Sequence, residues 1–221
     1  MSKCQIINLN VIYSKLKIQI ERFLMLSWND KKSLSFLINA FQEDKVVLCS
    51  SDTVLGLFAR LSEKTKKKID SIKKRNLKPY IVMVKSFDIV LEFIDQDLNP
   101  DMVSIMKKYW PGPLTIIFKA KKTLPAWMVG TDGTIAMRIP DHQGLQAVLD
   151  VVDSLFTTSA NISDQPLPAS YNQVSPLILE QVDEVCCDPV MVYDGPASTI
   201  IDFSCDAIVI IRQGVIKIDS I

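Results

Sequence analysis

Cations that lie close together in the chain could bind an anion. Lys73 and Arg75 end a lysine-rich segment, and Lys78 follows them in the stretch SIKKRNLKPY. From Lys64 to Lys78 the chain carries eight Lys or Arg residues and one acid. Charge alone leaves three interpretations: a solvated helix end favoured by the helix dipole, a nucleic-acid patch, or the rim of an anion site. The third needs donors from other segments, because a phosphate group is bound by several fixed donors.

Such donors occur near the ends of other apolar segments. Ser159 and Asn161 are two residues apart, so their side chains share one side of an extended chain. Arg138 and Arg212 each end an apolar run of residues. The segment SSDTVLGL (50–57) places hydroxyl groups directly after a third apolar run, KVVLC (45–49). In open α/β sheets, ligands bind near strand ends beside such loops. Each feature is common by itself, and only their order along the chain is informative.

The elements that would position these residues alternate between helix and strand. Amphipathic spacing and capping residues predict helices over 34–41, 62–75, 87–95, 100–109, 143–152 and 172–183. Short apolar runs predict strands over 45–49, 80–84, 114–120, 134–139, 154–159, 198–203 and 207–214, with another short strand from Val215. No internal repeat or linker interrupts them. The predicted fold class is α/β, a single domain with a twisted mixed β-sheet flanked by helices.

The composition argues against several classes of protein. The 25 basic and 25 acidic residues balance, which argues against a general polyanion binder. The five cysteines show no CxxC spacing and fit reduced thiols, and His142 is the only histidine, so we expect no metal site built from protein side chains. No apolar stretch approaches the ~18 residues that span a bilayer, and no signal-peptide pattern is present. We expect a cytoplasmic protein without membrane contact.

The N-terminal residues differ from the rest. Residues 1–24 are mildly amphipathic and lack a clear turn, whereas 25–221 contain all the elements above. We therefore expect an N-terminal extension, residues 1–24, followed by one domain, residues 25–221. Met25 is a candidate start codon, which the intact mass of the natively expressed protein would test; an ordered N-terminal helix is the alternative.

Seven segments together resemble the threonylcarbamoyl-AMP synthase family of YrdC/Sua5-type proteins. In chain order they read SSDTVLGL, KKRNLKPY, WPGPLT, AMRIP, SANISD, STIID and IIRQG, from residue 50 to residue 214, and the resemblance as a whole covers about residues 34–214. The resemblance implies a YrdC-like fold, with a twisted mixed sheet and helices around a wide basic cavity. It also implies the short form of the family, with the catalytic domain only.

The activity implied by this resemblance is a nucleotidyl transfer. Family members combine L-threonine, bicarbonate and ATP into threonylcarbamoyl-AMP and pyrophosphate, with Mg²⁺ held mainly by the ATP phosphates. A downstream transferase complex then modifies adenosine 37 of tRNA, so the implied partners include that complex and possible direct contact with tRNA.

The resemblance also carries site residues to matching positions. The signature tetrad falls on Lys73, Arg75, Ser159 and Asn161. ATP contacts are implied at Arg75, Lys78, Thr134, Ser159 and Arg212. Threonine contacts are implied at Thr53, Arg138, Thr157 (through its backbone) and Ser198. Such a reaction needs positioning and charge stabilisation more than a protein nucleophile, which agrees with these residue types.

Several positions depart from the family pattern, although no tetrad position is lost. They are Ser50 and Ser51 in place of Pro-Thr, Leu55 for Tyr, Asn76 for Pro, Asp164 for Gly and Leu167 for Ser. We expect a divergent but active enzyme. One alternative is an RNA-binding or regulatory module on the same fold without turnover. Another is a carbamoyl-transfer domain of hydrogenase-maturation proteins, but those carry acylphosphatase-like and zinc-finger parts that this chain lacks.

Overall fold

A mixed β-sheet forms the centre of the molecule. The computed structural model describes residues 26–74, 80–187, 192–205 and 207–218. These residues form a nine-stranded sheet in the order β7-β1-β2-β6-β3-β5-β4-β8-β9. The β1–β7, β3–β5 and β4–β8 pairs are parallel and the other pairs are antiparallel. The strands are β1 (Val47–Cys49), β2 (Gly56–Arg60), β3 (Ile81–Val84), β4 (Leu114–Lys119), β5 (Thr134–Arg138), β6 (Ser154–Ser159), β7 (Glu184–Cys186), β8 (Thr199–Asp202) and β9 (Val209–Arg212). The predicted α/β fold class is confirmed.

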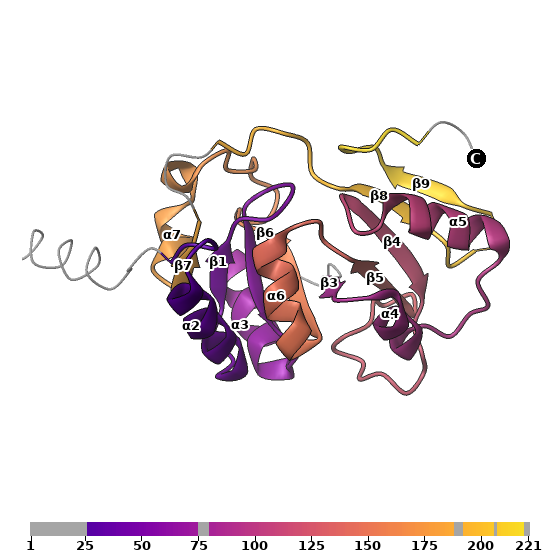
Figure 1. Cartoon of the computed structure of the whole chain (residues 1–221), viewed down its shortest axis with the longest axis horizontal. Helices are drawn as coiled ribbons and strands as arrows, with labels where there is room; N and C mark the ends of the chain where they lie inside the picture. The colour runs from indigo at the N-terminus through magenta and orange to yellow at the C-terminus, as the bar shows by residue number, and fades with distance from the viewer. Residues whose placement is uncertain (1–25, 75–79, 188–191, 206, 219–221) are drawn as a thin grey trace, which may run out of the picture.

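Helices cover the two faces of the sheet unequally. They are α2 (Lys31–Gln42), α3 (Glu63–Lys73), α4 (Phe87–Phe93), α5 (Pro100–Tyr109), α6 (Gln143–Val152), α7 (Pro176–Leu179) and the short 3₁₀ helix η1 (Tyr171–Gln173). Helices α2 and α6 pack together against one face, around Phe58 and Met83. Helices α3, α4, α5 and α7 contribute to the larger core on the other face. In Figure 1, α2, α3 and α6 gather around β1, β2 and β6, and α4 and α5 lie beside β4 and β5.

Side-chain caps begin the helices where the sequence predicts them. Asp30 accepts hydrogen bonds from the backbone at the start of α2. Ser62 caps α3, and Asn99 caps α5 with Pro100 in its first turn. Helix α3 ends at Lys73 because Lys74 adopts a left-handed conformation, with φ 51°. Among the described residues, no helix is long and apolar enough to cross a membrane.

The sequence-based expectations are wrong in four places. The predicted helix over 172–183 is reduced to the 3₁₀ helix η1 and the one-turn α7, because Pro176 lacks an N–H and keeps Ser175 out of the helical conformation, with ψ 132°. Strand β2 was not predicted, because it is buried on both faces and shows no alternation. The three-residue β7 was also not predicted. No strand begins at Val215, whose N–H donates to the Ala197 carbonyl outside the sheet.

Candidate active site

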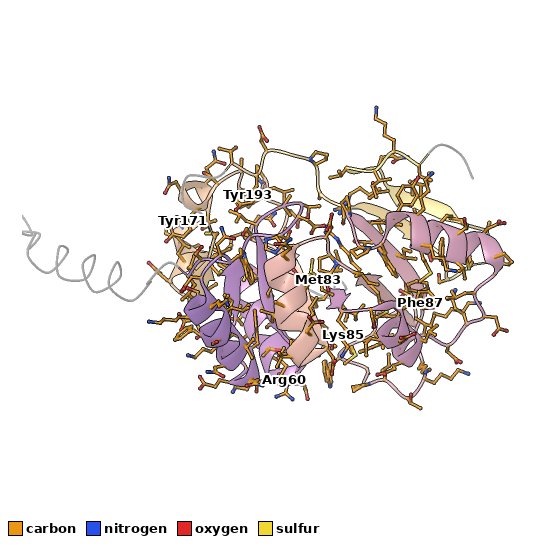
Figure 2. All side chains as sticks on the ribbon, viewed as in Figure 1. Arg60, Met83, Lys85, Phe87, Tyr171 and Tyr193 are labelled. Carbon is orange, nitrogen blue, oxygen red and sulfur yellow. The ribbon has the colours of Figure 1, made fainter. Side chains whose placement is uncertain are left out.

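A cavity of about 480 Å³ opens on the sheet face that carries α2 and α6. Phe58 and Met83 identify this face, because both belong to the hydrophobic core beneath α2 and α6 and both also line the cavity. Met83 lies near the middle of the molecule in Figure 2. The walls come from strands β2, β3, β4, β5, β6, β8 and β9, from the β1–β2 loop, from the end of α3, from the loop after β6 and from the segment before β8. The volume lies within the ~300–1,000 Å³ typical of small-molecule sites.

Most of the predicted site residues that the structure describes meet in this cavity. Lining it are Thr53, Lys73, Arg138, Thr157, Ser159, Asn161, Ser198 and Arg212. Thr134 does not line the cavity, although it lies in β5 two residues before Ala136, which does. The Thr134 hydroxyl donates instead to Asp132 Oδ1 at 2.7 Å. Arg75, Asn76 and Lys78 lie outside the described residues, so their roles stay predictions.

Lys73 anchors the loop that follows β6. Its ammonium group donates to the main-chain oxygens of Ser159 at 2.5 Å and Asn161 at 2.8 Å, and to Asn161 Oδ1 at 3.2 Å. The residue is only 2% exposed. An ammonium group has three N–H donors, and these oxygens can accept all of them. Lys73 therefore holds the SAN loop, which we define as residues 159–161, against the C-terminal end of α3.

Further hydrogen bonds orient the SAN loop from both sides. The Ser163 N–H donates to the Lys73 carbonyl at 3.2 Å, and the Ala160 N–H donates to the Leu55 carbonyl at 2.9 Å. Ser159 Oγ donates to Asn161 Oδ1 at 2.6 Å. The Ser159 and Asn161 side chains therefore face the cavity in a defined arrangement, held by the two segments that the sequence analysis singled out.

Arg138 is a buried cation at the end of β5. Its Nε donates to the Gly112 carbonyl at 3.0 Å, its Nη1 donates to Thr53 Oγ1 at 3.1 Å, and its Nη2 lies 2.6 Å from Asp52 Oδ2. The Nη2 contact is an ion pair by distance, but Nη2 makes no well-oriented hydrogen bond among the described residues. Contacts with three other residues therefore fix this guanidinium at the wall of the cavity.

Arg212 and Ser198 form a second polar group beside Arg138. Arg212 donates from Nε and Nη2 to the Ser198 carbonyl, at 3.1 and 2.8 Å, and from Nη2 to Ser198 Oγ at 3.2 Å. Ser198 Oγ also lies 2.9 Å from Thr115 Oγ1. Gly214 permits this arrangement, because a Cβ there would meet the Ala197 carbonyl oxygen at 2.1 Å.

The two arginines create a site that favours an anion. Burial lowers the pKa of Arg138, while Asp52 acts in the opposite direction. Burial also lowers the pKa of Arg212, and the positive charge of Arg138 adds to that shift. Because an arginine stays protonated in proteins, both guanidinium groups keep their positive charge at the cavity wall, and Asp52 offsets part of the charge of Arg138.

Sequence reasoning did not assign three groups that complete this site. Asp52, the Gly112 carbonyl and Thr115 contact Arg138 or Ser198, yet none was named as a site residue. Asp52 lies inside the SSDTVLGL segment, where it is the single acid, so that segment contained a usable signal. Gly112 and Thr115 lie inside the WPGPLT segment, but they act through contacts with residues distant in sequence, so the segment alone did not indicate their partners.

The departures from the family pattern are accommodated in different ways. Ser50 Oγ accepts a hydrogen bond from Trp28 Nε1 at 2.9 Å, and Ser51 Oγ donates to the Val54 carbonyl at 2.9 Å. Leu55 is fully buried in the core. Asp164 and Leu167 both line the cavity. Three of the changed residues thus have structural partners of their own, and two alter the cavity wall.

The lysines on the solvent side of α3 do not form an isolated basic patch. Each of the four lies within 4 Å of a carboxylate: the pairs are Lys64–Asp44, Lys66–Asp70, Lys67–Glu63 and Lys68–Asp183. Exposed pairs of this kind add little stability, but their charges cancel locally. This part of the basic run is therefore a neutralised helix surface, distinct from Lys73 in the cavity.

Comparison with known proteins identifies the family. Residues 39–214 match the family model Sua5_yciO_yrdC, described as "Telomere recombination". The chain belongs to this Sua5/YciO/YrdC family.

Individual relatives agree with this membership. The chain is 37% identical over 193 residues to a Methanocaldococcus jannaschii protein named "Putative threonylcarbamoyl-AMP synthase", covering 86% of this chain and 90% of that protein. It is 30% identical to the Pyrococcus abyssi threonylcarbamoyl-AMP synthase, covering 81% of this chain but only 53% of that protein.

Solved structures show the same fold. The P. abyssi Sua5 structure complexed with L-threonine superposes with a TM-score of 0.75 and 28% identity, over 84% of this chain and 55% of that chain. E. coli YciO superposes with a TM-score of 0.75 over 87% of this chain and 95% of that chain, and its 18% identity supports the fold alone.

Proposed function

We propose that this protein is an L-threonylcarbamoyladenylate synthase. The observation that carries the proposal is the convergence of two polar groups in one cavity: Lys73 with the SAN loop, and Arg138 with Arg212 and Ser198. Arginine side chains that can bind a carboxylate or phosphate, together with Ser159 and Asn161 side chains that can orient a nucleotide, suit a reaction that joins an amino acid and a nucleotide in one site. The likeness to threonylcarbamoyl-AMP synthases, one of them solved with L-threonine, supports the choice of substrates.

L-threonine is assigned to the Arg138 end of the cavity. The buried guanidinium would pair with the substrate carboxylate, and Thr53, Ser198 and the Thr157 backbone would orient the amino and hydroxyl groups. Arg138 is held by Gly112 and Asp52, so it is positioned before substrate binds. ATP is assigned to the side formed by the SAN loop, Arg212 and the predicted contacts at Arg75, Lys78 and Thr134.

The chemistry then requires no protein nucleophile. The threonine nitrogen attacks the carbon of CO₂ or bicarbonate, with loss of water in the second case, and forms a carbamate. A carbamate oxygen attacks the α-phosphorus of ATP, and pyrophosphate leaves in line. The fixed cations stabilise charge on the phosphates, and the cavity walls hold the reactants together.

The donor set of the cavity fits Mg²⁺ that arrives with ATP. Mg²⁺ prefers oxygen ligands and commonly combines one or two carboxylates with substrate phosphates and water. Among the described lining residues, the cavity offers serine and threonine hydroxyls and the carboxylate of Asp164. We therefore propose that the ATP phosphates hold Mg²⁺ for the most part, where it would offset phosphate charge.

The product of the proposed reaction requires a second protein that uses it. Threonylcarbamoyl-AMP is a reactive mixed anhydride, so a transferase must consume it, and the proposed acceptor is adenosine 37 of tRNA. A cytoplasmic location and possible direct contact with tRNA belong to the same proposal. An RNA-binding module without turnover is less well supported, because the α3 lysines are paired with acids.

Release of pyrophosphate tests this function. The purified protein is incubated with ATP, bicarbonate and Mg²⁺, with and without L-threonine. We expect threonine-dependent release that is lost in Lys73→Ala and Arg75→Ala and kept in Lys67→Ala, a matched lysine on the exposed side of α3. If release does not depend on threonine, the synthase proposal is rejected; salt-sensitive RNA binding without turnover would then favour the module.

A further inference from the structure

Trp28 connects the start of α6 to the loop between β1 and β2, the β1–β2 loop (residues 50–55). The indole Nε1 donates to Ser50 Oγ at 2.9 Å. The indole ring also makes an edge contact with the His142 ring, with 5.0 Å between the ring centroids. Gly144 leaves room for the indole, because a Cβ at that position would meet Trp28 Cε3 at 2.4 Å. Trp28 is therefore packed against α6 and donates its N–H to the β1–β2 loop.

The β1–β2 loop carries two partners of Arg138. Thr53 Oγ1 accepts a hydrogen bond from Arg138 Nη1 at 3.1 Å, and Asp52 Oδ2 lies 2.6 Å from Arg138 Nη2. Asp52 Oδ2 also accepts the Asp141 N–H at 3.0 Å, next to the cap residue of α6. The start of α6 thus braces the loop directly at Asp52 and, through the indole, at its first residue. The position of the loop in turn helps to set the position of the Arg138 guanidinium.

Ser50 is the point at which this brace depends on a side chain of the loop. The resembling motif has proline at this position, and a proline ring presets φ. Serine has no such restriction, so hydrogen bonds hold the start of the loop. The Ser50 N–H donates to the Cys186 carbonyl at 3.1 Å, and Ser50 Oγ accepts from Trp28. Ser50 is only 4% exposed, and Trp28 Nε1 is the only partner of its hydroxyl among the described residues.

We propose that Trp28 is a positioning residue for the binding of L-threonine. It acts through Ser50 on the β1–β2 loop, and the loop acts through its two contacts with Arg138. This inference rests on the proposed function, because it requires L-threonine at the Arg138 end of the cavity. Trp28 lies before residues 39–214, which match the family model, and it does not line the cavity. The family match therefore does not assign it a role.

Two single variants remove the same hydrogen bond from opposite sides. Trp28→Phe removes the N–H and keeps an aromatic ring against His142 and Gly144, and Ser50→Ala removes the acceptor. One neutral hydrogen bond corresponds to roughly a threefold to tenfold change in an equilibrium constant. We expect the dissociation constant of L-threonine to rise by that factor in each variant. The double variant should show no further rise, because both changes remove one shared interaction.

Calorimetric titration with L-threonine, in the presence of a non-hydrolysable ATP analogue and Mg²⁺, measures this dissociation constant. Titration with the analogue alone measures nucleotide binding, which a positioning role at the Arg138 end leaves unchanged. Trp127→Phe is the matched control, because Trp127 packs against the larger core, with its ring 5.9 Å from that of Phe156, and does not line the cavity. Thermal melts establish that each variant is folded, and Ser50→Ala decides the test if Trp28→Phe is not.

The expected result is weaker binding of L-threonine in both single variants and equally in the double variant, with unchanged nucleotide binding and a wild-type Trp127→Phe. Wild-type binding of L-threonine by the folded variants overturns the inference and leaves the proposed function standing. An equal effect of Trp127→Phe or an equal loss of nucleotide binding also overturns it, because the cause would then be a general loss of structure. Additive effects in the double variant overturn it as well, because Trp28 would then not act through Ser50. Failure of wild type to bind L-threonine overturns the proposed function and the inference with it.

Discussion

Replacing Lys73 with methionine should lower both stability and turnover. Methionine keeps the length of the side chain but removes the ammonium group, so the Ser159 and Asn161 main-chain oxygens lose their shared donor. A buried acceptor left without a donor costs about 1–3 kcal/mol. Part of this loss is offset, because methionine avoids the desolvation cost of a buried ammonium group. We expect a net loss of about 2 kcal/mol in the free energy of unfolding.

This loss is large enough to measure in a protein of this size. For 150–250 residues it corresponds to a decrease in Tm of about 4–8 °C. Because the SAN loop forms one wall of the cavity, its displacement should also reduce kcat by about 10²-fold. Thermal denaturation and threonine-dependent pyrophosphate release measure the two effects on the same preparation.

Lys67→Met is the matched control for this experiment. The Lys67 side chain is 74% exposed and pairs only with Glu63 among the described residues, so its replacement should change stability by less than about 0.5 kcal/mol. A Lys73→Met variant with wild-type Tm would refute the anchoring role. If its turnover were nevertheless lost, Lys73 would act on substrate directly and not through the loop.

Further predictions concern the other end of the cavity, a close backbone contact at Gly214 and the start of α6. Arg138→Lys should raise the KM for threonine by about 10²-fold in pyrophosphate release, because a lysine cannot reproduce the planar guanidinium contacts; an unchanged KM would move threonine elsewhere. Gly214→Ala should destabilise the fold by about 1–3 kcal/mol in denaturant unfolding, because the new Cβ meets the Ala197 carbonyl, and wild-type stability would contradict the close contact. Burial lowers the pKa of His142 below its ordinary value of 6.5, and its Nδ1 accepts the Leu145 N–H that begins α6. Because the folded-state pKa is the lower one, this stabilisation is present above pH 6.5 and is lost as the pH falls toward the folded-state pKa. The Tm of wild type minus the Tm of His142→Asn should therefore decrease as the pH is lowered from about 7.5 to about 5.5. A Tm difference that does not change with pH would contradict this prediction.

Local sequence signals predicted most of the helices, because the information lies within a few residues. Asp30, Ser62 and Asn99 cap the helices that follow them. The same local reasoning failed over 172–183, where apolar spacing suggested a helix that Pro176 interrupts. It also missed β2, since a strand buried on both faces has no alternation to detect.

The candidate site was predictable only as an ordered set of motifs. The resemblance named Lys73, Ser159, Asn161, Arg138, Ser198 and Arg212, and the structure places all six on one cavity. It also named Thr134, which lies outside that cavity and stays a prediction. Asp52 and Thr115 were not named, because their contacts with Arg138 and Ser198 join segments that are far apart in the chain.

The sequence by itself determined which residue types are available, where most helices begin, and to which family the motif order points. The tertiary structure decided how the lysine-rich segment divides. Lys64, Lys66, Lys67 and Lys68 pair with acids around α3, whereas Lys73 is buried and anchors the SAN loop. The reason is physical: charge along a chain is a local property, but the partners of a charge and its exposure to water depend on segments that only folding brings together.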